Sequence, residues 1–239
     1  AAAQGIIAGI NAHNKIHQSN KEFILGRDQA YIGVLIDDLI TKGTEEPYRM
    51  FTSRAEYRLS LRADNADLRL TNKGIDIGIV SKSREQIFKE KSKNLALISA
   101  KMDKLSISPS KISNFNINIA KDGVLRSASQ ILSQRGVNMN KIRDVWPIIP
   151  YISKEIDDQL EINAHYKGYL NKQNADILAF KRDESLKIPD NVNYDNLSGL
   201  SNEVKAKFKE IRPKTMGQAL RIDGITPAAV YILLSHVKR

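Results

Sequence analysis

Arginine is concentrated in one short stretch of this chain. The 25 residues from Glu46 to Leu70 contain five arginines and no lysine. A guanidinium group binds phosphate through two parallel hydrogen bonds and stacks on nucleobases, whereas the ammonium group of lysine is a mobile point charge. The stretch therefore predicts a surface that binds an anionic ligand such as phosphate or nucleic acid. The residues that would bind it are Arg49, Arg54, Arg58, Arg62 and Arg69.

The spacing of these arginines leaves their backbone conformation open. Arg54, Arg58 and Arg62 are four residues apart, and each such step turns a helix by only about 40°, so a helix would place all three on one face. Even spacing would also place them on one side of a strand. Periodicity therefore does not decide between helix and strand for residues 47–62. The alternative to a binding surface is a solvated face whose arginines pair with acids of the same stretch, Glu56, Asp64 and Asp67.

Composition favours a polyanionic partner and excludes several kinds of site. The 239 residues carry 37 basic and 27 acidic side chains, a net charge of +10. The chain has no cysteine, which excludes disulfides, thiolate metal sites and cysteine nucleophiles and is typical of proteins from a reducing cytosol. His13 and His17 are four residues apart but have no third ligand nearby, so we expect no metal site. No apolar run approaches the roughly 20 residues of a membrane span.

The first residues, AAAQGIIAGINAH, predict a helix with isoleucines on one side. The stretch lacks an initiating methionine and a capping residue, which indicates the C-terminal part of a longer protein. Small side chains in the first turn would let a cofactor carbonyl or phosphate approach the free amides at the positive end of the helix dipole. The alternative is an ordinary tightly packed helix of alanine and glycine.

The rest of the chain reads as mainly helical. Apolar spacing predicts helices over about 28–40, 83–105 and 153–181, and residues 106–123 read as a loop. Three capping boxes are expected, at Ser83 with Gln86, Ser127 with Gln130, and Thr215 with Gln218. The helix that starts at 83 would bury Ile87, Leu95, Ile98, Met102 and Leu105.

The C-terminal region predicts short, well-capped helices. Ser201 and Thr226 precede two of them as N-caps, and Pro227 occupies the first helical position of the last. The segment RIDGITPAAVYIL is similar to helix-hairpin-helix modules, which hold DNA phosphates through backbone amides. The same pattern is typical of many helix pairs that bind no nucleic acid, so it indicates the turn more strongly than it indicates DNA.

Together these segments resemble the C-terminal part of the GidA/MnmG family, the FAD-binding subunit of the tRNA uridine 5-carboxymethylaminomethyl modification enzyme. The resemblance covers nearly the whole chain and is weakest between about 105 and 150. It is carried by AAAQGIIAGINA, by QAYIGVLIDDLITKGTEEPYRMFTSRAEYRLSLRADNADLRLTNKG, by YKGYL at 166–170 and by LSGLSNEVKAKFKEIRPKTMGQALRIDGITPAAVYILL.

The resemblance implies a fold and a division into domains. Residues 1–80 would be the end of an FAD-binding α/β domain with the arginine-rich tRNA-facing segment. Residues 81–239 would be a C-terminal helical-bundle domain, in which about 155–239 docks a partner. The fold class expected for the chain is mainly α.

The resemblance also implies a function. The family modifies carbon 5 of the wobble uridine of tRNA with FAD, a reduced nicotinamide cofactor, methylene-tetrahydrofolate and the GTPase partner MnmE, and its members form homodimers in the cytoplasm. Gln4, with Ala3 and Gly5, would belong to the FAD site, and the five arginines would face the flavin and the tRNA anticodon stem. The expected partner-binding residues are Gly199, Leu200, Ser201, Gly224 and Ile225.

The family's Gly-rich dinucleotide-binding loop and catalytic cysteines lie upstream of the segments seen here. We therefore expect no catalytic residue in this chain, which would bind tRNA, the edge of FAD and a partner without catalysing the reaction alone. An alternative is a stand-alone basic helical module that binds nucleic acid or protein through its terminal hairpin. A remnant of a split gene is also compatible with these residues.

Overall fold

The structure is a computed structural model that describes residues 1–17, 22–43, 47–184 and 186–237, without the side chains of 171–184 and 237. Glu46, where the arginine-rich stretch begins, lies outside the described residues. The chain forms two compact units. Unit 1 combines Ala1–Leu61 with Gln173–Arg239, and unit 2 is Arg62–Lys172.

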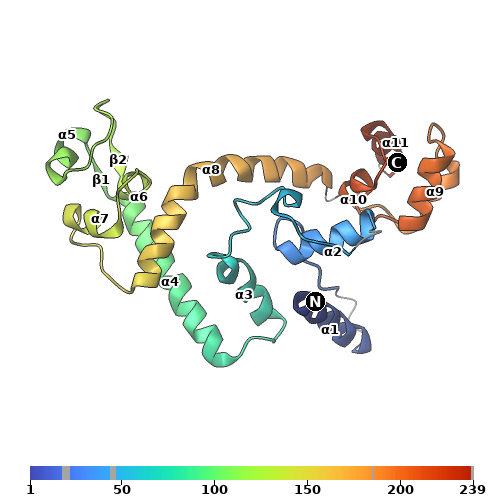
Figure 1. The fold of residues 1–239 in the computed structure, drawn as a ribbon, viewed down its shortest axis with the longest axis horizontal. Helices are drawn as coiled ribbons and strands as arrows, with labels where there is room; N and C mark the ends of the chain where they lie inside the picture. The colour runs from blue at the N-terminus through green and yellow to red at the C-terminus, as the bar shows by residue number, and fades with distance from the viewer. Residues whose placement is uncertain (18–21, 44–46, 185, 238–239) are drawn as a thin grey trace. The chain divides into compact units, whose positions relative to one another are not determined.

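Helices dominate both units, which confirms the mainly α fold class (Figure 1). None of the described helices is long and apolar enough to cross a membrane. Unit 1 contains α1 (Ala2–Ile16), α2 (Tyr31–Thr41), the 3-10 helices η1 (Thr52–Arg54) and η3 (Tyr194–Asn196), α9 (Asn202–Ile211), α10 (Met216–Arg221) and α11 (Pro227–Val237). Unit 2 contains α3 (Ala66–Asp76), α4 (Lys82–Lys104), β1 (Ser106–Ile107), α5 (Pro109–Ile112), η2 (Ser113–Phe115), β2 (Arg126–Ser127), α6 (Ala128–Leu132) and α7 (Met139–Val145). Helix α8 (Lys154–Glu184) runs from unit 2 into unit 1.

The core of unit 2 forms around α4. Leu95, Ile98 and Met102 follow one another at helical spacing and are all buried, as the sequence predicts. They pack with Ile142 of α7 and Leu160 of α8 in one hydrophobic cluster. Figure 1 shows α6 lying against the C-terminal end of α4.

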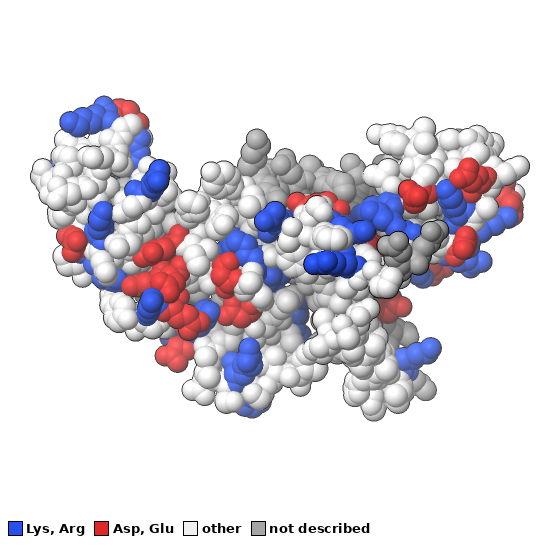
Figure 2. Space-filling view, in the orientation of Figure 1, with Lys and Arg blue, Asp and Glu red and all other residues white. Residues whose placement is uncertain are grey.

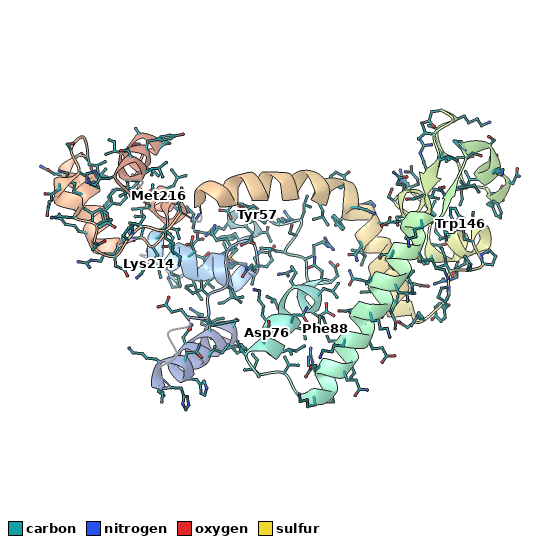
Figure 3. The ribbon with its side chains drawn as sticks, turned by 180° about the vertical axis from the view of Figure 1, so that it is seen from behind. Tyr57, Asp76, Phe88, Trp146, Lys214 and Met216 are labelled. Atoms are coloured by element: carbon teal, nitrogen blue, oxygen red, sulfur yellow. The ribbon has the colours of Figure 1, made fainter. Side chains whose placement is uncertain are left out.

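Two predictions at the start of α4 are wrong. The N-cap is Ser81, whose Oγ accepts a hydrogen bond from the amide of Arg84 at 3.4 Å, so the capping box expected at Ser83 does not form. Ile87 is 68% exposed, and the neighbouring Phe88 is buried on the side of α4 that faces α3 (Figure 3). Phe88 lies seven residues before Leu95 and so continues its stripe, whereas Ile87 is turned away by about 100°.

Residues 106–123, predicted as a loop, contain short regular elements. Ser106 and Ile107 of β1 pair antiparallel with Ser127 and Arg126 of β2. The capping box of Ser127 with Gln130 is confirmed and starts α6.

The C-terminal helices of unit 1 share a separate core that includes Phe208, Met216 and Leu233. Met216 follows the exposed Lys214 by two residues at the start of α10 (Figure 3). The predicted N-caps of α9 and α11 are confirmed by hydrogen bonds to the hydroxyls of Ser201 and Thr226.

The third predicted capping box forms only in part. The amide of Gln218 donates to Oγ1 of Thr215 at 3.2 Å, as expected. The side chain of Gln218, however, accepts from the amide of Lys214 at 2.7 Å instead of from that of Thr215. It therefore ties down the residue before the cap.

We predict that Ile98→Ala lowers the free energy of unfolding by about 2–5 kcal/mol, because it leaves a cavity in the core of unit 2. Ile87→Ala on the same helix is the matched control and should change it by less than about 0.5 kcal/mol. Urea unfolding followed by circular dichroism measures both. Equal losses for the two variants would contradict the packing of α4 described above.

Candidate nucleic-acid interface

The arginine-rich segment of unit 1 is neither a helix nor a strand along its length. Residues 47–61 contain one 3-10 turn, η1, and are otherwise irregular, so no helical face brings Arg54 and Arg58 together. Ala55, Tyr57 and Leu61 are buried and pack with Val34 of α2. Arg54 and Arg58 lie next to the buried Ala55 and Tyr57 in the chain, and their own side chains are exposed at the surface.

Arg27 is the residue that holds this segment against α2. Its side chain is only 7% exposed. One terminal nitrogen, Nη1, lies 2.7 Å from Asp38 Oδ1 and 3.1 Å from Asp37 Oδ2 of α2. The other, Nη2, donates to Glu56 Oε1 at 2.8 Å and to the carbonyl of Arg54 at 2.9 Å. One buried guanidinium thus joins α2 to the backbone and side chains of residues 54–56.

The turn that carries Arg27 lies directly against α2. A Cβ atom on Gly33 would overlap the carbonyl oxygens of Leu25 and Gly26. Only the lack of a side chain at Gly33 allows this approach. The amides of Gly33 and Val34 donate to the carbonyl of Ala30 as α2 begins.

Asp38 is the most buried carboxylate of the network, with its side chain 1% exposed. Burial alone would raise the pKa of Asp38, but hydrogen bonds from Tyr48 and Arg27 hold it below its ordinary value. The hydroxyl of Tyr48 donates to Oδ2 at 2.7 Å. Burial and this bond to Asp38 raise the pKa of Tyr48 to about 12. Asp38 is therefore ionised at neutral pH.

The network extends to the C-terminal helices of unit 1. Arg221 of α10 donates to both carboxylate oxygens of Asp37, from Nε at 2.7 Å and from Nη2 at 3.1 Å. Both side chains are largely buried. Asp37 therefore bridges Arg27 and Arg221, and α10 is fixed to α2 by a bidentate ion pair.

Arg54 and Arg49 are held over aromatic rings. The guanidinium carbon of Arg54 lies 5.0 Å from the ring centroid of Tyr48, and Nη1 lies 3.4 Å from Asp38 Oδ2. Arg49 lies 5.4 Å from the ring centroid of Phe51. Cation–π contacts of this kind restrict where the charge points. Both arginines and Arg58 are exposed.

The two remaining arginines of the stretch belong to unit 2, where they make structural contacts. Arg62 lies 3.0 Å from Asp64 and 4.5 Å from the ring centroid of Tyr166, and its side chain is 10% exposed. Arg69 donates to Asn65 at 2.8 Å and to the carbonyl of Arg62 at 3.1 Å. Burial would raise the pKa of Asp64, but the hydrogen bonds from Arg62 and Gln159 lower it.

The alternative in which the arginines pair with neighbouring acids of the stretch holds for Arg62. Arg62 pairs with Asp64, whereas Glu56 pairs with Arg27 and Asp67 pairs with Lys91. Sequence reasoning missed Arg27, Asp37, Asp38 and Arg221. Two adjacent carboxylates in the otherwise apolar α2 were the available signal, because a buried carboxylate needs a cationic partner.

The residues expected at the FAD site lie in the first turn of α1. Ala3, Gln4 and Gly5 are exposed, and α1 buries none of its residues in the described part of the chain. Its N-cap, Ala1, provides no side-chain hydrogen bond. Asn11 joins α1 to the next segment through a pair of hydrogen bonds with the backbone of Phe23. Where residues are described, no cluster of three or more potential metal ligands occurs.

The expected partner-binding residues form corners of the C-terminal helical core. Gly199 and Gly224 adopt the left-handed conformation, with φ of +92° and +75°. Leu200 is buried, Ser201 caps α9, and Ile225 packs against the core. These residues shape the turns before α9 and between α10 and α11.

Comparison with known proteins gives consistent matches along the chain. Residues 82–174 match the family model "tRNA modifying enzyme MnmG/GidA C-terminal helical domain", and residues 176–239 match "tRNA modifying enzyme MnmG/GidA C-terminal helical bundle". The chain is 44% identical to the tRNA uridine 5-carboxymethylaminomethyl modification enzyme MnmG of Listeria innocua, over 100% of the chain and 38% of the relative. Its identity to the enzyme of the same name from Caldicellulosiruptor saccharolyticus is 46%, over 98% of the chain and 38% of the relative.

A solved structure agrees with these matches. The structure of Aquifex aeolicus GidA in the form II crystal superposes with a TM-score of 0.86 at 35% sequence identity, over 100% of this chain and 38% of that one. The chain thus spans about two fifths of the length of the relatives it matches.

We predict that Asp38→Asn lowers the free energy of unfolding by about 3 kcal/mol at pH 7, because it leaves the buried Arg27 and the half-buried Tyr48 without their shared anion. The pKa of Asp38 is below 3.8 in the folded protein. Its contribution should therefore be fully present above about pH 5 and be lost as the pH falls through the folded-state pKa.

Urea unfolding of both proteins across this pH range measures the difference. Asp144→Asn, at an exposed position of α7, is the control and should match the unchanged protein at every pH. A difference between Asp38→Asn and the unchanged protein that persists undiminished at the lowest pH would contradict the assignment.

Proposed function

The chain belongs to the MnmG/GidA family of tRNA-modifying enzymes, and we propose that it is the C-terminal part of an enzyme that modifies carbon 5 of the wobble uridine of tRNA. The whole protein would carry out the reaction, and this chain would supply binding surfaces. Residues 1–80 would complete the FAD-binding domain, and residues 81–239 would form the helical domain.

The observation that carries the proposed tRNA contact is the arrangement of Arg49, Arg54 and Arg58. All three are exposed, and the first two are oriented by aromatic rings. The Arg27 network fixes the segment beneath them, so little side-chain and backbone entropy remains to be lost when phosphate binds. We assign direct phosphate contact to these three arginines. Arg62 and Arg69, which are engaged within unit 2, would shape the tRNA-facing surface of that unit.

The cofactor assigned to the intact protein is FAD, whose flavin would supply the redox chemistry. Gln4, with Ala3 and Gly5, would lie at its edge. The exposed first turn of α1 fits this role, because nothing lies within 4 Å of a Cβ built on Gly5 and the free amides of the turn can donate to a carbonyl or phosphate oxygen. A reduced nicotinamide cofactor and methylene-tetrahydrofolate would be the co-substrates of the complex.

The partner assigned to the C-terminal helices is the GTPase MnmE. The turns at Gly199, Leu200 and Ser201 and at Gly224 and Ile225 are anchored on the C-terminal core through Leu200 and Ile225, so they would lose little freedom on docking. We also assign a homodimer to the intact protein. No catalytic residue is assigned to this chain, which we propose to be inactive by itself.

The tRNA contact predicts a specific salt dependence. Arg49→Gln combined with Arg58→Gln should weaken binding of unmodified tRNA and lower the slope of log K against log[salt] by about 1.5, because two phosphate contacts and their released counterions are lost. Filter binding between about 50 and 200 mM salt measures the slope.

A matched control is Arg84→Gln combined with Arg135→Gln, which removes two exposed arginines of unit 2 and leaves the same net charge. It should keep nearly the slope of the unchanged chain. The proposal fails if the two double variants lose affinity equally, since net charge alone would then account for the binding.

A further inference from the structure

A cavity of about 640 Å³ lies within the C-terminal helices of unit 1. Its walls are the segment of residues 188–195, which leads into η3, and the corner of residues 209–214, where α9 ends and the chain turns toward α10. The size is typical of a ligand pocket and far exceeds what a single small ion fills. None of the residues proposed above for tRNA, FAD or partner binding lines it, so its function is a separate question.

Three cationic and two acidic side chains line the cavity, so one cation has no acidic partner among the lining residues. Nζ of Lys209 lies 2.5 Å from Asp195, and Nζ of Lys214 lies 2.9 Å from Asp190. The third cation, Arg212, is exposed, and its guanidinium has no hydrogen bond or ion pair with any residue that the structure describes. Figure 2 shows acidic and basic side chains intermingled over the C-terminal helices on the face that it displays. The cavity therefore has a net charge that suits one monoanion.

A largely buried tyrosine lines the same cavity. Tyr194 is 8% exposed, and its ring packs on Phe208 with the centroids 5.5 Å apart. Its hydroxyl makes no hydrogen bond within the described ranges of the chain. Burial raises the pKa of Tyr194, while Arg212 acts in the opposite direction and Asp190 in the same one. The phenol thus stays protonated, within electrostatic reach of both side chains, and can donate to an acceptor in the cavity.

The backbone of Arg212 is the unusual feature of the corner. It adopts the left-handed conformation, with φ of +46° and ψ of +62°, while its amide donates to the carbonyl of Phe208 and ends α9. Glycine or asparagine is the ordinary residue at such a position, and Pro213 restricts the conformation further. A strained arginine at a helix end places its guanidinium where a relaxed backbone would not, and such outliers are concentrated at binding sites.

We infer that this cavity binds a carboxylate side chain of an acidic protein segment, with Arg212 as the bidentate cation and Tyr194 as the second donor. The rim acids Asp190 and Asp195 neutralise two of the three cations. The remaining charge matches one carboxylate and attracts a polyanion such as nucleic acid only weakly. The apolar walls formed by Pro189, Val192 and Pro213 fit the side chains on either side of that carboxylate. A small free anion would pair with Arg212 but would make no apolar contacts with these walls.

The test titrates the 239-residue chain with the peptide Ac-Ala-Leu-Glu-Leu-Ala-NH2 and records amide NMR spectra of the isotope-labelled protein. We expect saturable shifts confined to residues 188–195 and 209–214. The same peptide with glutamine in place of glutamate should bind at least about tenfold more weakly, because it cannot form the charge-assisted hydrogen bonds. Glutarate and inorganic phosphate, added alone, represent free anions and should bind more weakly than the glutamate peptide.

Three substitutions separate binding from folding. Arg212→Gln should abolish the shifts, and Tyr194→Phe, which keeps the ring on Phe208, should weaken binding. Arg212→Gly should also abolish binding while raising the melting temperature, because glycine adopts the left-handed conformation without strain. Arg84→Gln, at an exposed arginine of unit 2, should change neither quantity.

Unchanged binding in Arg212→Gln, or the absence of saturable shifts with the glutamate peptide, would overturn the inference. If glutarate or phosphate bound as tightly as the glutamate peptide, the ligand would be a free anion and not a protein segment, which would also overturn the inference. Displacement of the peptide by single-stranded RNA with the same confined shifts would show instead that the cavity binds nucleic acid.

Discussion

The buried guanidinium of Arg27 is the contact on which the first part of unit 1 depends. It bonds to three carboxylates and to two backbone carbonyls, from Val34 in α2 and from Arg54. Removing a charge of this kind from water is costly, and the cost is offset only when every donor finds a well-placed acceptor. Here the acceptors come from both sides of the contact, so the pairing can form only when the segment of residues 54–56 lies against α2.

The same charge balance reaches the end of the chain. Asp37 accepts from Arg27 and from Arg221, which lies in α10. Two arginines on one buried carboxylate require a second anion nearby, and Asp38 and Glu56 supply that charge around Arg27. The exposed arginines therefore rest on a layer in which positive and negative charges are closely matched. Arg54 takes part in that balance through Asp38, whereas the charges of Arg49 and Arg58 are left for solvent or for a ligand.

Much of the helical framework follows from local sequence. Caps at Ser127, Ser201 and Thr226 are set by residues three or fewer positions away, and the stripe of Leu95, Ile98 and Met102 is set by helical period. The residue predicted to be buried at the start of α4 was wrong: Ile87 and Phe88 are both apolar, but Phe88 continues the stripe of Leu95 and lies on the buried side. The elements between 106 and 127 escaped prediction because two-residue strands have no periodicity to detect.

The candidate site shows the same division. Arginine content alone indicated an anion surface, and the resemblance of the segment indicated its family. Which arginines are exposed depends on partners distant in sequence, such as Tyr166 for Arg62, which no local pattern reveals. Arg27 bonds to residues that lie 7 to 29 positions away, and Arg221 joins the network to Asp37 across 184 positions. The geometry of the network could therefore be read only from the folded chain.

The arginine surface is more sensitive to substitution of Gly33 than to substitution of its own arginines. An exposed arginine can be exchanged for lysine or glutamine and leave the backbone where it is. Any mutation that adds a side chain at Gly33 pushes the Leu25–Gly26 turn off α2 and displaces Arg27 from its carboxylates. A single-base change in the codon of Gly33 would therefore disable the cationic surface, although Gly33 itself carries no charge and does not belong to that surface.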